Sequence, residues 1–158
     1  MEFAALAPIL VVLVLGAMSP GPSLAVLLRN TMEGGKARGV SCGVGHGIGF
    51  GIYAFVAIAG IAQLKASASE AATILELAGG LFLIILAAMM IKGSDEELEH
   101  KHSSKRGFTE GFLIAFLNPK ILVFLIAIFS QFVQPDFTWS ERLIIASIAL
   151  LIDGGWYV

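Results

Sequence analysis

Long hydrophobic stretches without charge are the feature that most restricts how this chain can fold. Phe3 to Leu28 contains no Asp, Glu, Lys or Arg, and neither does Val40 to Leu64. Each stretch is longer than the roughly 20 residues that a helix needs to cross the hydrocarbon core of a bilayer. An α-helix also satisfies its own backbone hydrogen bonds, which lipid does not do. Both stretches are therefore predicted to be transmembrane helices.

Three further apolar stretches each contain a single charged residue. They are residues 71–91 with Glu76, residues 111–133 with Lys120, and residues 143–158 with Asp153. The first two are long enough to span a bilayer, whereas the last is short for a full crossing. The sequence therefore predicts an all-α, polytopic membrane helix bundle.

The composition supports a lipid environment and excludes several other partners and activities. The chain is 57% hydrophobic and 14% charged, against about 25% charged residues in soluble domains. Its basic residues form no continuous patch, which argues against nucleic acid as a partner. The single cysteine, Cys42, permits neither an internal disulfide nor a paired-cysteine metal site. No metal or cofactor is expected, and a homo-oligomer is compatible with the sequence.

The distribution of Lys and Arg predicts an orientation in the membrane. The first stretch has the length of a signal-peptide core, but Glu2 precedes it without any Lys or Arg, so we expect it to be retained. Basic residues are concentrated in the loops after the first and third stretches. They are Arg29, Lys36 and Arg38, and then Lys92, Lys101, Lys105 and Arg106, against Lys65 and Arg142 in the opposite loops. The positive-inside rule then places the amino terminus outside.

The third loop, KGSDEELEHKHSSKRG, is the one segment with the composition of a linker. It divides the chain into a first three-helix repeat at residues 1–92, a cytoplasmic linker at 93–107 and an incomplete second repeat at 108–158. Within the linker, His100 and His102 have acidic neighbours and leave a metal site open as an alternative. The preferred interpretation is a solvated hinge between the two repeats.

Two proline-containing breaks interrupt the apolar stretches. The first break lies at Pro20, Gly21 and Pro22 in AMSPGPS, and the second break lies at Asn118, Pro119 and Lys120 in FLNPKIL. Proline removes a helical hydrogen bond and frees a carbonyl group. Unwound backbone at membrane depth is tolerated only where it is buried in protein or lines a wet cavity.

The two breaks occupy corresponding positions, each in the first stretch of its repeat. Paired proline-interrupted segments of this kind are the best sequence indicator of the binding site in a transporter built from inverted repeats. The alternative is that both prolines merely kink their helices. Lys120, directly beside the second break, favours the functional interpretation.

The charges inside the apolar stretches need a reason, because each costs about 2.5–3.5 kcal/mol on insertion scales. We expect Lys120 to bind a substrate carboxylate or to pair with Asp153, although its long side chain also allows snorkelling to the membrane surface. For Asp153, two interpretations stay open. Its carboxyl group takes and releases a proton during transport, or it faces a polar surface near a helix end.

The second apolar stretch has a glycine ridge at Gly39, Gly43, Gly47 and Gly51, with Gly45 and Gly49 beside it. Small residues spaced by four allow another helix to approach closely. His46 lies next to this ridge. It is a candidate proton-responsive group of the cavity, or alternatively a histidine that is hydrogen-bonded to a neighbouring helix.

Two long runs resemble a known family. LGAMSPGPSLAVLLRNTMEGGKARGVSCGVGHGIG is similar to the amino-terminal signature of the LysE/RhtB family of amino-acid exporters, and GFTEGFLIAFLNPKILVFLIAIFSQFV is similar to its second signature. With the matching order of segments, the resemblance covers essentially the whole chain. It implies a six-helix inner-membrane protein that exports amino acids or close derivatives and is driven by the proton gradient.

The resemblance also implies that the two broken segments form the substrate site. It places Pro20, Gly21 and Pro22 in one half and Asn118, Pro119 and Lys120 in the other, and it matches Asp153 to an acidic position of the fifth helix. Family members continue beyond the point that matches Val158. The sequence therefore predicts a truncated product or an incomplete gene sequence, and it leaves the activity of this chain by itself open.

Two other classes of protein were compared with the transporter. An intramembrane enzyme is not expected, because HExxH, GxSxG and a second cysteine are all absent from the sequence. A membrane scaffold or helper subunit is the stronger rival. Such a protein needs no polar cavity, so the discriminating observation is whether the two breaks and Lys120 converge on one internal cavity.

Overall fold

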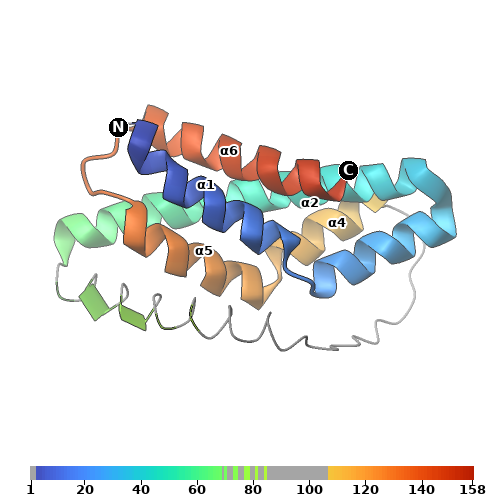
Figure 1. Cartoon of the computed structure of the whole chain (residues 1–158), viewed down its shortest axis with the longest axis horizontal. Helices are drawn as coiled ribbons and strands as arrows, with labels where there is room; N and C mark the ends of the chain where they lie inside the picture. Colours follow the sequence, from blue (N-terminus) through green and yellow to red (C-terminus); the bar gives the residue numbers. More distant parts are fainter. Residues whose placement is uncertain are drawn as a thin grey trace.

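The computed structural model describes residues 3–68 and 107–158, together with Glu70, Thr73, Ile74, Leu77, Ala78, Leu81 and Ile84. Most of the predicted third span, His100, His102 and nearly all of the predicted linker lie outside the described residues. The described regular structure is entirely helical, which confirms the all-α prediction. Its helices are α1 (Phe3–Met18), α2 (Pro22–Ser67), α4 (Gly107–Phe116), α5 (Pro119–Phe132) and α6 (Trp139–Tyr157) (Figure 1).

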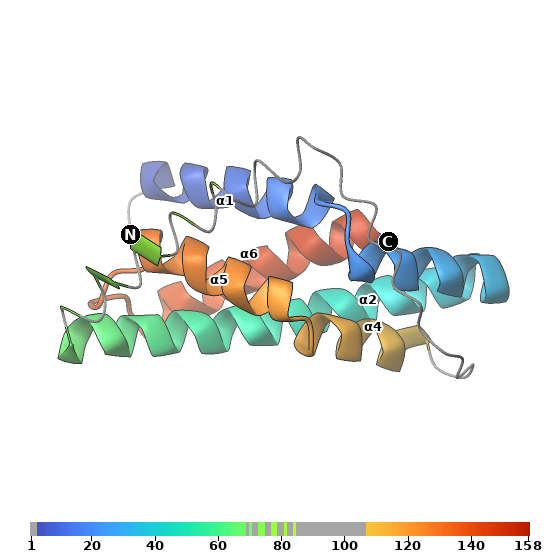
Figure 2. The same ribbon diagram turned by 90° about the horizontal axis from the view of Figure 1, so that it is seen from below.

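The first apolar stretch is two helices rather than one. Helix α1 ends at Met18 and α2 begins at Pro22, so the chain is non-helical where the first break was predicted. In Figures 1 and 2, α1 and the opening turns of α2 follow each other in the same general direction. The predicted unwinding is confirmed here, because Pro20 lies in the non-helical segment. Pro22 is the first residue of α2, where its missing N–H costs nothing.

Helix α2 reverses its direction at a single residue, Gly35. The backbone there has φ 72° and ψ −179°, a left-handed conformation that glycine adopts without strain. The prediction of a longer loop between the first two apolar stretches is therefore wrong. Helix flanks this turn on both sides, and Arg29 and Arg38 are both helical residues.

The second break separates α4 from α5 and bends the chain by 54°. Leu117 and Asn118 are the non-helical residues, and Pro119 opens α5 as its first residue. As at the first break, proline begins a helix instead of interrupting one. In Figures 1 and 2, α4 and α5 run opposite to α1 and the opening turns of α2.

Among the described residues, only some helices are long and apolar enough to cross a membrane. Helix α2 passes this test by itself, and α4 with α5 passes it if the bent pair is one span. The apolar part of α1, Leu6–Met18, is shorter. Five apolar stretches were predicted, with breaks in the first and the fourth and with the fifth short for a full crossing. The two breaks are the physical reason why the first and fourth stretches are not single helices.

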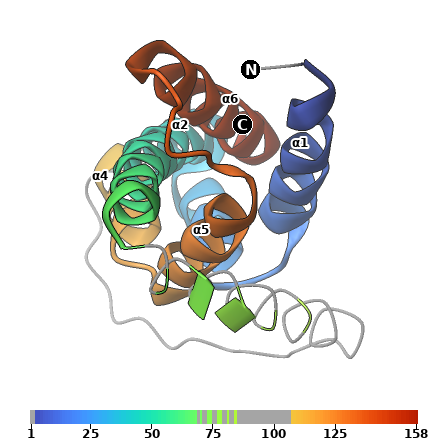
Figure 3. The same cartoon turned by 90° about the vertical axis from the view of Figure 1, so that its left-hand side faces the viewer.

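Helix α2 is the centre of the bundle and packs against α4, α5 and α6, while α1 packs against α5 and α6 (Figure 3). The glycine ridge makes this packing close, as predicted. A Cβ atom at Gly47 would lie 2.7 Å from the Cα of Gly154, and one at Gly51 would lie 2.7 Å from the Cβ of Leu150. These separations are shorter than real side chains allow, so α6 approaches α2 only because this face carries no side chains.

Candidate functional site: a cavity between the two breaks

A cavity of about 40 Å³ lies where the two breaks meet the middle of α2 and the end of α6. This volume holds only a few water molecules. The lining residues come from four segments of the chain that are far apart in the sequence. They are Gly16, Ala17, Ser19, Gly21, Pro22, Ser23, His46, Phe50, Asn118, Lys120, Ile121, Phe124, Asp153 and Tyr157.

Lys120 connects the second break to the first. Its Nζ atom donates hydrogen bonds to Ser19 Oγ at 2.9 Å and to the carbonyl oxygen of Pro20 at 3.0 Å. The ammonium group therefore satisfies a backbone oxygen that the first break leaves without a helical partner. Lys120 is partly buried and is directed at the break. The described contacts therefore differ from the predicted alternative of snorkelling to the membrane surface.

The amino termini of two helices reach the cavity and make this end electropositive. Helix α2 begins next to Gly21, which has no side chain to cap it, and α5 begins next to Asn118. The Asn118 side chain accepts a hydrogen bond from the Lys120 amide at 3.0 Å. A helix amino terminus carries a partial positive charge and free N–H groups, and both favour an anion. Together with Lys120, this end of the cavity is suited to a carboxylate.

The opposite side of the cavity holds a buried histidine–carboxylate pair. His46 Nδ1 and Asp153 Oδ2 are 2.6 Å apart, and each side chain is 3% exposed. The Tyr157 ring lies against the imidazole, with 4.4 Å between the ring centroids. The prediction that Lys120 pairs with Asp153 is not met, because the ion-pair partner of Asp153 among the described residues is His46. The glycine face of α2 allows this contact, since it lets α6 approach.

Most of the predicted site residues meet at this cavity. Gly21, Pro22, Asn118, Lys120, His46 and Asp153 line it. Pro20 is exposed and contributes its carbonyl oxygen through Lys120, and Pro119 is exposed and does not line the cavity. His46 lines the cavity and is bonded to a neighbouring helix, and its role as a proton-responsive group stays a prediction.

Sequence reasoning missed several lining residues, and helical spacing was the signal that would have found three of them. Phe50, Phe124 and Tyr157 follow His46, Lys120 and Asp153, respectively, by four residues. Residues four apart lie on the same helix face. Ser19 and Ser23 flank the first break and were also missed. Their hydroxyl groups are buried at the cavity.

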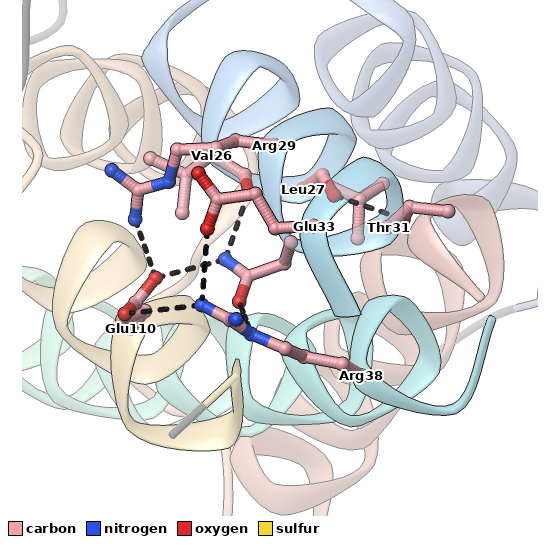
Figure 4. A network of polar contacts seen from close by, with 8 residues as sticks. Val26, Leu27, Arg29, Thr31, Glu33, Arg38 and Glu110 are labelled. Atoms are coloured by element: carbon pink, nitrogen blue, oxygen red, sulfur yellow. Dashed lines mark hydrogen bonds and ion pairs between the residues drawn. The ribbon is translucent and has the colours of Figure 1, made fainter. Parts of the chain in front are cut away.

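A second polar cluster joins both parts of α2 to α4 and contains no residue that lines the cavity (Figure 4). Glu110 accepts hydrogen bonds from Arg29 and from Asn30, which is fully buried. The Arg38 Nε atom donates to Asn30 Oδ1 at 2.7 Å, and its Nη2 atom lies 3.6 Å from Glu33. The two arginines and two glutamates balance in charge. The cluster therefore joins the helices that flank Gly35 to α4.

Comparison with known proteins assigns the chain to a family. Residues 14–158 match the model of the LysE type translocators. The chain belongs to the LysE family, as the two sequence signatures predicted. Membership of a translocator family agrees with the membrane location expected from composition.

Individual relatives are distant. The chain is 25% identical over 139 residues to the uncharacterized membrane protein YahN of Escherichia coli (strain K12), covering 84% of this chain and 62% of that protein. It is 24% identical over 148 residues to the threonine efflux proteins of Salmonella typhi and Salmonella typhimurium, covering 89% of this chain and 72% of theirs. The chain thus spans less than two thirds of the length of the Escherichia coli relative. No solved structure matches it.

Proposed function

We propose that the protein containing this sequence exports an amino acid, or a close derivative, across the bacterial inner membrane with its amino terminus outside. The observation that carries the proposal is the convergence of both breaks and Lys120 on one cavity. The threonine efflux proteins among the relatives supply the class of substrate. Breaks that only kink two helices would give no reason for a lysine to meet the other break.

The substrate carboxylate binds at the electropositive end of the cavity. Lys120 Nζ exchanges its contacts with Ser19 Oγ and the Pro20 carbonyl for the carboxylate oxygens. A carboxylate carries a full negative charge, so it is a stronger acceptor for the ammonium than a hydroxyl or carbonyl oxygen, and this favours the exchange. The amino termini of α2 and α5 add N–H groups and the positive ends of their dipoles.

The cavity opens and closes by movement of one broken pair of helices against the other. Its 40 Å³ is too small for an amino acid, so binding requires α1 and the opening of α2 to separate from α4 and α5. The opposite directions of the two pairs are those expected of inverted repeats at residues 1–92 and 108–158, joined by the linker at 93–107. Rocking of such repeats about a fixed site gives alternating access.

The proton gradient drives export through His46 and Asp153. Both side chains are buried at the cavity and bonded to each other. An ionisable pair inside an apolar bundle marks proton relays in membrane proteins. A scaffold or helper subunit would need neither this pair nor a polar cavity, so the convergence of the breaks favours transport over that rival.

Export assays on two lysine variants test the proposal. Lys120→Met keeps the length of the side chain and removes its charge, whereas Lys36→Met removes a charge at the exposed turn next to Gly35. We expect Lys120→Met to reduce export by about 10- to 100-fold, from the loss of about 1.5–3 kcal/mol of charge-assisted hydrogen bonding. Lys36→Met should export normally.

The measurement uses cells that express the full protein containing this sequence and are loaded with a threonine dipeptide. Release of threonine into the medium is followed over time, and the amount of each variant in the membrane is measured by immunoblot. Unimpaired export by Lys120→Met, at an equal amount of protein, would remove the lysine from the site. Absence of export of any amino acid by the unsubstituted protein would contradict the proposed function itself.

A further inference from the structure

The cavity has two poles of different chemistry, and one ring nitrogen at the second pole has no assigned task. Lys120 and two helix amino termini form the first pole, and His46 with Asp153 forms the second. His46 Nδ1 is engaged with Asp153. His46 Nε2 is buried and has no hydrogen-bond partner among the described residues. A buried polar atom without a partner costs about 1–3 kcal/mol, so it needs an explanation.

The bond to Asp153 determines how the imidazole can change its charge. With Asp153 ionised, its carboxylate only accepts hydrogen bonds, and His46 Nδ1 then carries the hydrogen in both the neutral ring and the imidazolium. Nε2 is then the only ring atom whose protonation changes. In the neutral ring, Nε2 is an acceptor with a lone pair. In the imidazolium, the same atom is a donor that carries positive charge.

The titratable groups on the helices around the imidazole leave Nε2 as the atom at which we expect the proton to exchange. Helix α6 supplies Asp153 and Tyr157, and α5 supplies Lys120 at the far pole. On α2 itself, Cys42 lies one turn before His46 and is buried. The titratable side chain of α4, Glu110, is engaged with Arg29 and Arg38. Along its described lining of the cavity, α1 with the first break supplies the hydroxyl of Ser19 and no ionisable group.

We propose that Nε2 of His46 binds the substrate ammonium and the coupling proton in alternation, so that one excludes the other. This inference rests on the proposed export function. With His46 neutral, the lone pair of Nε2 accepts a hydrogen bond from the ammonium while Lys120 holds the carboxylate. A proton from outside then adds to that lone pair. The resulting imidazolium is stabilised by Asp153, offers the ammonium no acceptor and repels it.

Mutual exclusion at one atom is sufficient to couple the two movements. The proton leaves Nε2 on the cytoplasmic side, which restores the lone pair for the next substrate. An amino acid then moves out while a proton moves in, and the two never cross the membrane together. The pairing of two poles at one cavity also selects a zwitterion, because the substrate must present a carboxylate and an ammonium group at the same time.

The pH dependence of substrate binding tests this inference. The probe is L-threonine, with 2-hydroxybutyrate as an analogue that lacks the ammonium group, and binding to the purified full protein is measured calorimetrically between pH 5 and 8.5. We expect threonine affinity to fall about tenfold per pH unit on the acidic side, as for competition with one proton. Binding of 2-hydroxybutyrate should be weaker and should lack this fall.

Variants of the pair separate the inference from its rivals. His46→Gln keeps a hydrogen bond to Asp153 but does not titrate, so its threonine binding should be weak and independent of pH. The matched control, His102→Gln, lies in the predicted linker and should behave as the unsubstituted protein. Asp153→Asn removes the charge that stabilises the imidazolium, so the acidic loss of binding should move to lower pH. This second variant gives a test even if His46→Gln does not fold.

Four results would overturn the inference. Acidic loss of binding that persists in His46→Gln and disappears in Asp153→Asn would make the carboxylate the proton carrier. An equal acidic loss for 2-hydroxybutyrate would show that the ammonium does not compete with the proton. Normal export with the lysine dependence described above, but without any pH effect on binding, would leave the export function standing and remove His46 from coupling. Failure of any amino acid to bind would contradict both.

Discussion

The two breaks look alike in sequence but are stabilised in different ways. At the second break, Asn118 caps α5 locally by accepting a hydrogen bond from the Lys120 amide two residues later. At the first break, Gly21 has no side chain to cap α2, and the Pro20 carbonyl is bonded to Lys120, 100 residues further along the chain. The cap of α5 comes from within its own segment, although Asn118 Nδ2 also donates to Ser23 Oγ at 3.5 Å. The Pro20 carbonyl, in contrast, is satisfied from the other break.

This difference assigns different tasks to the two breaks. The second break is stabilised by the side chain of Asn118, so the backbone that positions Lys120 stays fixed. The first break loses a partner whenever Lys120 turns to a substrate, so its geometry responds to whether the cavity is occupied. We therefore expect substitutions at the first break to affect export more than matched substitutions at the second break.

The largest effect is expected from filling the space between the first break and Lys120. A Cβ atom at Gly21 would lie 3.2 Å from Lys120 Nζ, so a leucine side chain in Gly21→Leu would occupy the site of the carboxylate. The expected reduction in export is about 100-fold, equivalent to roughly 3 kcal/mol of overpacking. Gly60→Leu is the matched control, because no atom lies within 4 Å of a Cβ at Gly60.

Both glycine variants should reach the membrane in normal amounts, and threonine release from dipeptide-loaded cells is the measurement. Normal export by Gly21→Leu would mean that the first break is not part of the substrate site. The structural difference between the two breaks would then have no effect on export.

A smaller difference is expected from removing the prolines. Pro20→Ala combined with Pro22→Ala lets helical hydrogen bonds form across the first break, because no side-chain cap opposes them. Export should fall about tenfold, equivalent to roughly 1.4 kcal/mol. Pro119→Ala should change export less than about twofold, because Asn118 still caps α5. Equal losses at both breaks, measured in the same assay with equal amounts of protein, would show that the local cap does not protect the second break.

The smallest effect concerns the cap itself. Asn118→Ala removes the acceptor for the Lys120 amide and should lower the free energy of unfolding by about 1 kcal/mol. Asn118→Ser supplies another oxygen and should recover most of this loss. Denaturant unfolding of the purified protein in detergent, followed by the helical circular dichroism signal, measures both values. If serine were no better than alanine, the cap would not be what holds the second break.

The sequence predicted the breaks and the lysine well, and it predicted the partners of the charged residues poorly. Proline chemistry is local, so Pro22 and Pro119 indicated unwound backbone without any knowledge of the fold. Unwound backbone was predicted at both breaks, but the sequence analysis did not foresee that Pro22 and Pro119 each begin the helix that follows. The turn at Gly35 was also missed, since a polar stretch with three basic residues is typical of a longer loop.

The pair formed by His46 and Asp153 shows why the partners of the charged residues could not be predicted from the sequence. These residues are 107 positions apart, and each had a plausible alternative nearby, as Lys120 did for Asp153. The contact depends on how closely α6 approaches α2, which is decided by where the glycine faces meet. No local pattern contains that information.

By itself, the sequence determined that the chain is helical, where its helices break and which family it resembles, because apolar runs, prolines and signature motifs act through neighbouring residues. Only the tertiary structure decided that Lys120 satisfies the first break, that His46 takes Asp153 as its partner and that both lie at one cavity. The physical reason is that a buried charge is stabilised by whichever opposite group packing brings within about 3 Å of it. Packing of α2 against α5 and α6 is a property of the whole bundle.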